Sequence, residues 1–167
     1  GKCGYINRQG RMVIQPQSIH SAEFRDGLAQ AGDGKRIFYI DKTGKEVFAF
    51  PFAHDPVPFC GGFARGSIGL KFYYCDTKGK VLPGFHAATT SFSEGMAAVG
   101  VNPPRFDPAL RTKEMEWSPT KWGFIDRKGN IVIEPVFDWA YPFSEGFAGV
   151  LMNGQWGFIR SDGTWLL

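Results

Sequence analysis

Residues 121–154, KWGFIDRKGNIVIEPVFDWAYPFSEGFAGVLMNG, decide the fold, because the rest of the chain repeats them. An internal repeat is identified first, since it sets the architecture of the whole chain. The position of the tryptophan recurs at spacings of 34, 35, 50 and 34 residues, at Cys3, Ile37, Phe72, Trp122 and Trp156. A glycine follows seven residues later in each copy, at Gly10, Gly44, Gly79, Gly129 and Gly163. A second glycine, at Gly27, Gly62, Gly95 and Gly146, stands three residues after Phe24, Phe59, Phe92 and Phe143.

The repeating pattern predicts β-strands. Apolar residues flank short polar turns that open on Asp or Asn and close on Gly, which is the chemistry of tight turns. Gly or Pro interrupts the chain about every eight residues, which disfavours helices. A third strand follows each second glycine and presents small residues on one face, as at Ala29/Ala31, Ala64/Gly66, Ala97/Val99 and Ala148/Val150. Each unit is therefore predicted to be a three-stranded antiparallel meander.

The units are expected to stack, because one three-stranded unit buries too little surface to stand alone. We predict an all-β single domain over residues 1–167, with units at about 1–34, 35–69, 70–120, 121–154 and a partial unit at 155–167. The long third interval contains an insertion at about 101–119. An open curved or superhelical array is favoured over a closed propeller-like ring. Proline is expected to end the strand before each connector, at Pro16, Pro51, Pro83 and Pro135.

The unit resembles the WG (KWG) repeat of bacterial proteins, whose pattern of K-W-G-F-I-D, F-D and F-S-E-G is nearly intact in residues 121–150. The first three units depart from it, with Cys3 and Ile37 in place of Trp and with Phe38 and Tyr73 in place of Gly. The resemblance implies an all-β repeat region used for interaction, often in surface, secreted or toxin-associated proteins. It implies no specific ligand.

The overall composition argues against several classes of function. Net charge is +3 and no run of Lys or Arg exceeds two, so a nucleic-acid interface is not expected. No apolar stretch approaches the roughly 18 residues of a membrane-spanning helix. The sequence shows no signal peptide, but it starts at Gly1 without Met, as a processed or trimmed segment does. A periplasmic or extracytoplasmic location and a cytoplasmic one both stay open.

No set of residues suggests catalysis, and no cofactor is expected. The acidic residues recur at turn positions, where Glu94 and Glu145 are predicted to cap local backbone amides. The histidines, His20, His54 and His86, all fall in connectors. They could form a metal-binding ladder, but no carboxylate or thiol keeps step with them, so we favour partly exposed polar residues and no metal site. Cys3, Cys60 and Cys75 occupy repeat positions that suit small buried or half-buried thiols.

Two segments are candidates for binding a partner. The insertion offers Arg105, Phe106, Asp107, Arg111, Lys113, Glu114, Met115 and Trp117, and such Arg, Met and aromatic residues form the centres of interfaces. Alternatively, its aromatics fold back onto the array. Trp139 and Tyr141 in the fourth connector either pack at a seam between units or, if exposed, bind a partner. Trp122, Trp156 and Trp165 fit strand positions and are expected to be structural.

These features predict a non-catalytic protein–protein interaction module. The resemblance to WG repeats adds an inhibitor or immunity-type role against a toxin or effector as a special case. The alternative is a module that binds carbohydrate or the cell envelope through exposed Trp and Tyr.

Overall fold

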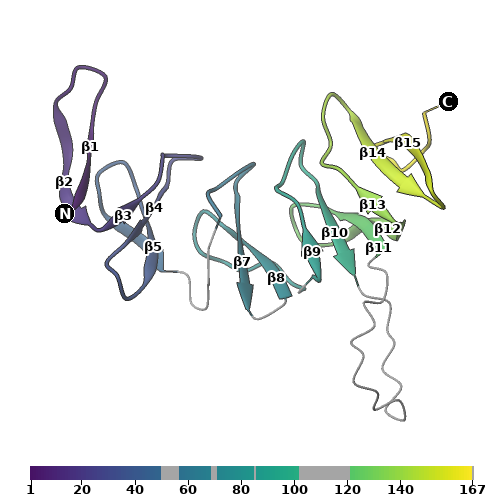
Figure 1. Ribbon diagram of the computed structural model, residues 1–167, viewed down its shortest axis with the longest axis horizontal. Helices are drawn as coiled ribbons and strands as arrows, with labels where there is room; N and C mark the ends of the chain where they lie inside the picture. Colours follow the sequence, from purple (N-terminus) through teal and green to yellow (C-terminus); the bar gives the residue numbers. More distant parts are fainter. Residues whose placement is uncertain (50–56, 69–70, 85, 102–120, 167) are drawn as a thin grey trace, which may run out of the picture. The chain divides into compact units, whose positions relative to one another are not determined.

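The computed structural model describes residues 1–49, 57–68, 71–84, 86–101 and 121–166. All regular structure in these residues is β, as short antiparallel strands joined by tight turns (Figure 1), and no strand set closes into a barrel. The all-β open array predicted from the sequence is thus confirmed. The chain divides into two compact units, Gly1–Leu82 and Pro83–Leu167.

The first compact unit contains three sheets. The first sheet pairs β1 (Cys3–Ile6) with β2 (Met12–Ser18). The second has the order β3 (His20–Ser21), β4 (Ala29–Gly32), β5 (Ile37–Ile40) and β6 (Glu46–Ala49). The third pairs β7 (Phe63–Ile68) with β8 (Lys71–Asp76).

The second compact unit contains two sheets. One has β9 (Ala88–Thr89), β10 (Ala97–Val101), β11 (Lys121–Ile125) and β12 (Ile131–Phe137) as successive neighbours. The other joins β13 (Trp139–Ala140), β14 (Phe147–Met152) and β15 (Gln155–Arg160). We refer to this last set of strands as the terminal sheet.

Each described sheet after the first joins two consecutive repeats. The third strand of one repeat pairs with the leading strand of the next, as β4 does with β5 and β10 with β11. A short turn at residues 33–36 brings β5 back alongside β4, and β11 pairs with β10 in the same way although residues 102–120 separate them. A sheet is therefore shared between repeats, and each repeat contributes to two layers.

The hairpin turns have the chemistry expected from the sequence. At the turn between β11 and β12, one Asp126 carboxylate oxygen accepts hydrogen bonds from the backbone N–H groups of Lys128 and Asn130, at 2.8 and 2.9 Å. Gly129 closes the turn with a φ of +87°, which residues with a Cβ rarely adopt. These local bonds fix where each strand ends.

The core lies between successive sheets. Ala148, Val150 and Ile159 of the terminal sheet are at most 1% exposed and pack in one cluster with Trp122 and Phe124 of the preceding sheet. The small residues of the third strand thus allow the close approach of the neighbouring layer. The phenylalanine that ends each connector fills the seam, and its ring centroid lies 4.8–4.9 Å from an aromatic ring of the leading strand in Tyr5–Phe24, Tyr39–Phe59 and Phe124–Phe143.

Successive repeats also meet at the turn glycines. The residue four positions after one turn glycine lies against the turn glycine of the next repeat, in the pairs Ile14–Gly44, Phe48–Gly79, Pro83–Gly129 and Ile133–Gly163. A Cβ added at Gly44 would lie 2.8 Å from the Ile14 side chain, and one at Gly79 would lie 2.7 Å from the Phe48 ring. The turn glycines therefore serve the stacking of repeats as well as the turn itself.

The proline prediction is wrong for two connectors. Pro16 and Pro135 lie inside β2 and β12 and do not end these strands. The pairing of β11 with β12 steps from Trp122–Phe137 to Phe124–Ile133, so the strand that carries Pro135 bulges. A bulge frees backbone groups from the ladder, and this is where a sheet tolerates proline.

The prediction of local capping by glutamates needs a correction. Glu94 Oε2 accepts a hydrogen bond from the N–H of Gly146, 52 residues away, at 3.0 Å. Asp26, at the same repeat position, accepts one from the N–H of Gly62 at 2.8 Å. Both carboxylates therefore tie one repeat to the next, because stacking puts equivalent turns side by side.

Candidate functional site

A group of exposed aromatic side chains covers one face of the terminal sheet. Directly paired residues of antiparallel strands share a face, and the pairs Trp139–Leu151, Leu151–Trp156 and Gly149–Phe158 lie on this one. The exposed fractions are 43% for Trp139, 53% for Tyr141, 58% for Trp156 and 56% for Phe158. We call these four residues, together with the 41% exposed Leu166, the aromatic face.

The exposure of the aromatic face has a simple cause in the layering. Trp156 and Phe158 occupy the repeat positions of Trp122 and Phe124, which are only 5% and 0% exposed. The terminal sheet covers that earlier pair. No described strand covers Trp156 and Phe158 in the same way, so rings that are core elsewhere lie at the surface.

The rings of the aromatic face are ordered by contacts with one another. Tyr141 stacks on Trp156 with centroids 5.5 Å apart and ring planes 21° apart, and Trp139 meets Tyr141 edge-on at 6.3 Å. Gly149 has no side chain to hold Tyr141 away from the strand: a Cβ there would lie 3.4 Å from the Tyr141 ring. Stacked and edge-on aromatic pairs favour fixed ring positions.

A groove of about 460 Å³ runs along the aromatic face. Its walls include Tyr141, Pro142, Phe147, Phe158 and Leu166, with Glu145 as the charged residue among its described lining. Glu145 has the same positive φ as Glu94, 54° against 51°, but its carboxylate accepts no hydrogen bond from the described residues. The site is thus an apolar groove with one carboxylate at its rim.

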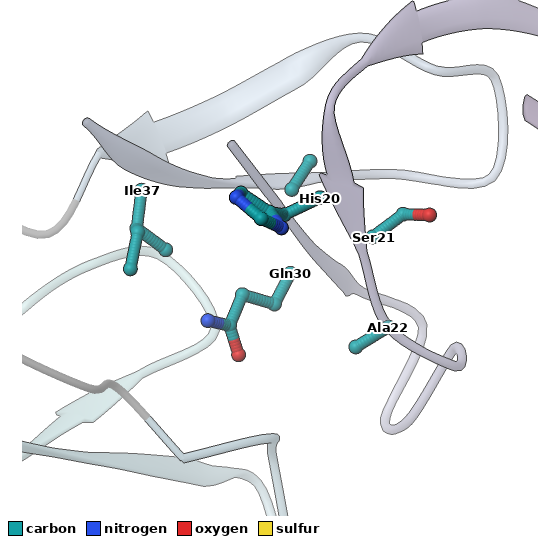
Figure 2. A pocket seen from close by; sticks show the side chains of 6 residues that line it. His20, Ser21, Ala22, Gln30 and Ile37 are labelled. Atoms are coloured by element: carbon teal, nitrogen blue, oxygen red, sulfur yellow. The ribbon is translucent and has the colours of Figure 1, made fainter. Parts of the chain in front are cut away.

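The corresponding surface of the first compact unit is more polar. A cavity of about 370 Å³ is lined by His20, Ser21, Ala22, Gln30, Ala31 and Ile37 (Figure 2). By repeat position, His20 corresponds to Trp139, Ala22 to Tyr141 and Ile37 to Trp156. In the first repeat, smaller side chains therefore leave open the space that the stacked aromatic rings fill at the equivalent positions of the fourth repeat.

The repeat positions of this site can be compared with known families. The family of the WG containing repeat matches residues 4–32 and 122–156. These two segments are WG repeats. No curated protein and no solved structure matches the chain.

The structure explains why the WG motif has its glycine. A Cβ at Gly123 would lie 2.4 Å from the Ile133 carbonyl oxygen, and one at Gly4 would lie 2.5 Å from that of Ile14. These are the two WG repeats whose second strand bulges at a proline. In the second repeat Phe38 replaces the glycine, and there β5 and β6 pair in step at Phe38–Ala49 and Tyr39–Phe48.

The WG lysine and the aspartate of the F-D pair also have a structural role. The Lys121 ammonium donates to the Asp138 carboxylate, which also accepts the Asn153 N–H at 2.8 Å. Lys121 first and the Asn153 N–H second hold the pKa of Asp138 below its usual value. Through these two hydrogen bonds, the Asp138 carboxylate links the start of β11 to the turn after β14.

The structure describes only two residues of the predicted partner-binding set. Trp139 and Tyr141 come together on the aromatic face. The other eight residues lie outside the described part of the chain: Arg105, Phe106, Asp107, Arg111, Lys113, Glu114, Met115 and Trp117. Sequence reasoning expected Trp156 and Trp165 to be structural and did not single out Phe158, yet all three are exposed, Trp165 at 42%. No local signal marked Trp156 and Phe158 as exposed, because their sequence matches that of buried Trp122 and Phe124.

The remaining titratable candidates are dispersed. His20 is exposed, His86 is buried with its pKa lowered by burial, and His54 lies outside the described residues. Among the residues that the structure describes, no three His, Cys, Asp or Glu side chains gather as a metal site requires. Burial raises the pKa of the Cys75 thiol to about 12, whereas Cys3 is exposed, unlike the buried or half-buried thiol predicted for that position. No helix of the described chain is long and apolar enough to cross a membrane.

Proposed function

We propose that this WG-repeat chain is a non-catalytic protein-binding module that engages its partner through the aromatic face. The observation that carries the proposal is the exposure of Trp156 and Phe158, each more than half accessible on one sheet face. Soluble proteins rarely leave several large rings side by side in water unless the surface is used.

The physical properties of the aromatic face suit protein recognition. Trp and Tyr are enriched among the residues that dominate binding free energy, where truncation costs about 2 kcal/mol or more. Because the rings already pack against one another, little side-chain entropy remains to be lost on binding. The groove offers apolar walls, and Glu145 at its rim can select a donor or a cation on the partner.

Selection from a random-peptide display library on the immobilised chain tests this proposal. We expect enriched peptides that bind the wild type and lose at least about tenfold in affinity on Phe158→Ala or Trp156→Ala, since about 1.4 kcal/mol corresponds to tenfold. Val47→Ala, at an exposed valine of β6 in the other compact unit, is the matched control. Peptides that bind both aromatic variants as well as the wild type would count against the aromatic face.

Carbohydrate binding is the second candidate. Tyr141 and Trp156 form a stacked pair beside an open groove, and exposed rings can pack on the apolar face of a sugar. A glycan array probed with wild type and Trp156→Ala separates the two proposals. Glycan binding lost in the variant, with no peptide selected, would replace the protein partner by a sugar.

The inhibitor or immunity-type role is a special case of the first proposal and rests on the family resemblance. It places residues 105–117 at the interface with a toxin or effector. A chain with residues 102–119 replaced by a short Gly-Ser linker should then bind selected peptides normally but fail to inhibit the toxin. Inhibition by the shortened chain equal to that of the wild type would remove the insertion from the interface.

A further inference from the structure

The hairpin turns of the first compact unit carry basic side chains at repeated positions. The turns are residues 7–11, 41–45 and 76–80, which read NRQGR, DKTGK and DTKGK. Each turn contains two basic residues, and all six are exposed: Arg8, Arg11, Lys42, Lys45, Lys78 and Lys80. The turns are 34 and 35 residues apart in the sequence, so no run of basic residues marks them.

One basic residue has the same backbone position in all three turns. It is the last residue of the turn, and its carbonyl oxygen accepts a hydrogen bond at 2.9 Å from the N–H of the first residue of the turn. These residues are Arg11, Lys45 and Lys80, and we call them the basic column. The fourth and fifth repeats have Asn130 and Thr164 at this position, so the basic column belongs to the first compact unit.

The stacking of layers brings the three turns together. Gly44 of the second turn lies against Ile14 of the first hairpin, and Gly79 of the third turn lies against Phe48 of the second. The Gln17 side-chain amide also donates a hydrogen bond to the Gly44 carbonyl oxygen at 2.8 Å. Stacked sheets lie about 10 Å apart, so the basic column presents one cation about every 10 Å along the stack.

The acidic residues of the same turns are used within the turns. Asp41 Oδ1 accepts hydrogen bonds from the N–H groups of Thr43 and Lys45, at 2.8 and 3.1 Å. Asp76 Oδ1 accepts two from the third and fifth residues of its own turn, both at 2.9 Å. Their carboxylates therefore serve the backbone, whereas the six basic side chains form no ion pair with any residue that the structure describes.

Other acidic side chains near these turns also have partners. β4 begins opposite the end of β5, so the turn at residues 23–27 lies at the same end of its sheet as the turn at 41–45. Each acidic residue of this turn, and the one that follows residue 45, bonds a basic side chain or a backbone N–H. The pairs are Glu23–Arg25, Asp26–Gly62 and Glu46–Arg36.

The charges of the two compact units differ in the same sense. Residues 1–82 contain twelve Lys and Arg against seven Asp and Glu, and residues 83–167 contain seven against nine. The small net charge of the whole chain therefore conceals a basic first unit. Such an excess attracts anionic ligands and raises their local concentration.

We propose that the basic column, with Arg8, Lys42 and Lys78 beside it, binds a linear acidic polysaccharide that runs from turn to turn. A regular line of cations fits a polymer whose carboxylates or sulfates recur at regular intervals, whereas a folded protein presents its carboxylates irregularly. Arg can bind such groups through two parallel hydrogen bonds, and Lys binds them as a point charge. This site lies in the other compact unit from the aromatic face and goes beyond the proposed function.

A nucleic acid fits these turns less well. Proteins hold single strands by stacking the bases on aromatic side chains. The exposed large apolar side chains described in the first compact unit include no aromatic ring: they are Ile6, Met12, Val13, Ile19, Val47 and Val81. A duplex carries one negative charge per about 1.7 Å, far denser than the basic column.

Fluorescence anisotropy with labelled polygalacturonate and labelled chondroitin sulfate at low salt tests the proposal. The wild type should bind at least one of the two, and the affinity should fall as salt screens the exposed charges. The triple variant Arg11→Gln/Lys45→Gln/Lys80→Gln should lose at least about tenfold in affinity, because each exposed ion pair contributes a factor of roughly two to three. All three side chains are exposed, so the variant should keep the circular dichroism spectrum of the wild type.

The triple variant Lys2→Gln/Lys35→Gln/Lys71→Gln is the matched control. These three lysines are also exposed, and they lie at or just before the start of β1, β5 and β8, at the opposite ends of these strands from the turns. The control removes the same charge from the same compact unit and should bind nearly as the wild type does. Equal losses in the two triple variants would show that total charge and not the basic column holds the ligand, which overturns the proposal.

The remaining outcomes also decide the question. Binding of neither polysaccharide at low salt overturns the proposal. Tighter binding of oligothymidylate or of polyglutamate of equal charge overturns it as well, and replaces the polysaccharide by a nucleic acid or an acidic protein segment. Trp156→Ala should leave polysaccharide binding unchanged, since a loss in that variant would move the site to the aromatic face. The result is therefore separable from that of the proposed function.

Discussion

Gly123 in β11 has no room for a side chain, and replacing it by alanine should measurably lower stability. The added Cβ would lie 2.4 Å from the Ile133 carbonyl oxygen, 2.8 Å from the Pro135 nitrogen and 2.9 Å from the Glu134 carbonyl carbon. All three are backbone atoms, so no side-chain rotation relieves the contact. The bulge of β12 has to move away from β11.

The magnitude follows from two opposing effects. Overpacking in a closely packed region costs about 1–3 kcal/mol. Alanine also restricts the unfolded chain relative to glycine, which offsets about 0.4–1 kcal/mol. The net loss for Gly123→Ala is about 1–2 kcal/mol, and for a chain of this size each kcal/mol lowers the thermal midpoint by about 2–4 °C. Gly4→Ala, with its Cβ 2.5 Å from the Ile14 carbonyl oxygen, should behave in the same way.

Thermal unfolding followed by near-ultraviolet circular dichroism provides the assay. Gly149→Ala is the matched control, because Gly149 is also a strand glycine and its added Cβ meets only side-chain rings, those of Tyr141 at 3.4 Å and Phe158 at 3.8 Å. We expect the control to melt within about 1–2 °C of the wild type, since the change is compatible with its backbone. A midpoint for Gly123→Ala equal to that of Gly149→Ala would refute the proposed role of the WG glycine.

Three further predictions follow from side-chain contacts. In chemical denaturation, Glu94→Gly should be less stable than Glu145→Gly by about 1 kcal/mol, because both changes relieve a positive φ but only Glu94 accepts a hydrogen bond from a neighbouring repeat. Equal stability of the two variants would show that the hydrogen bond from Gly146 contributes nothing. Alkylation of the native protein at pH 8, followed by mass spectrometry, should label the exposed Cys3 and spare Cys75, because burial raises the pKa of the Cys75 thiol to about 12. Labelling of both cysteines at similar rates would contradict the buried position of Cys75. The pKa of Asp138 is lowered in the folded state, so this carboxylate stabilises the fold at neutral pH and loses that effect as the pH falls through its folded-state pKa. The difference in stability between the wild type and Asp138→Asn should therefore shrink on acidification, and a difference that is constant from pH 7 to pH 2 would exclude this linkage.

Local features of the fold could be predicted from the sequence because they depend on a few adjacent residues. The Asp126 turn closes on Gly129 through bonds within five residues, and the alternation of Ala148 and Val150 marks the buried face of β14. These choices follow from backbone geometry and from which side of a strand each residue occupies.

Part of the candidate site was predictable and part was not. Trp139 and Tyr141 stood out because other connectors lack them, and the structure brings them together. Their neighbour Trp156 was not predicted, because its local sequence, QWGFIR, closely matches the KWGFID of buried Trp122. A side chain with the same neighbours in sequence is core or surface according to whether another layer lies above it.

The sequence by itself determined the repeat, its turns and the alternation of its strands, because these are set by short-range backbone and side-chain preferences. Tertiary structure decided which equivalent positions differ: Trp156 is exposed where Trp122 is buried, and Glu94 bonds Gly146 where Glu145 bonds no described residue. It also decided that Pro135 stays within a strand, since the bulge beside Gly123 accommodates it. The physical reason is the stacking of layers, which buries a face only when a neighbouring layer is present to cover it.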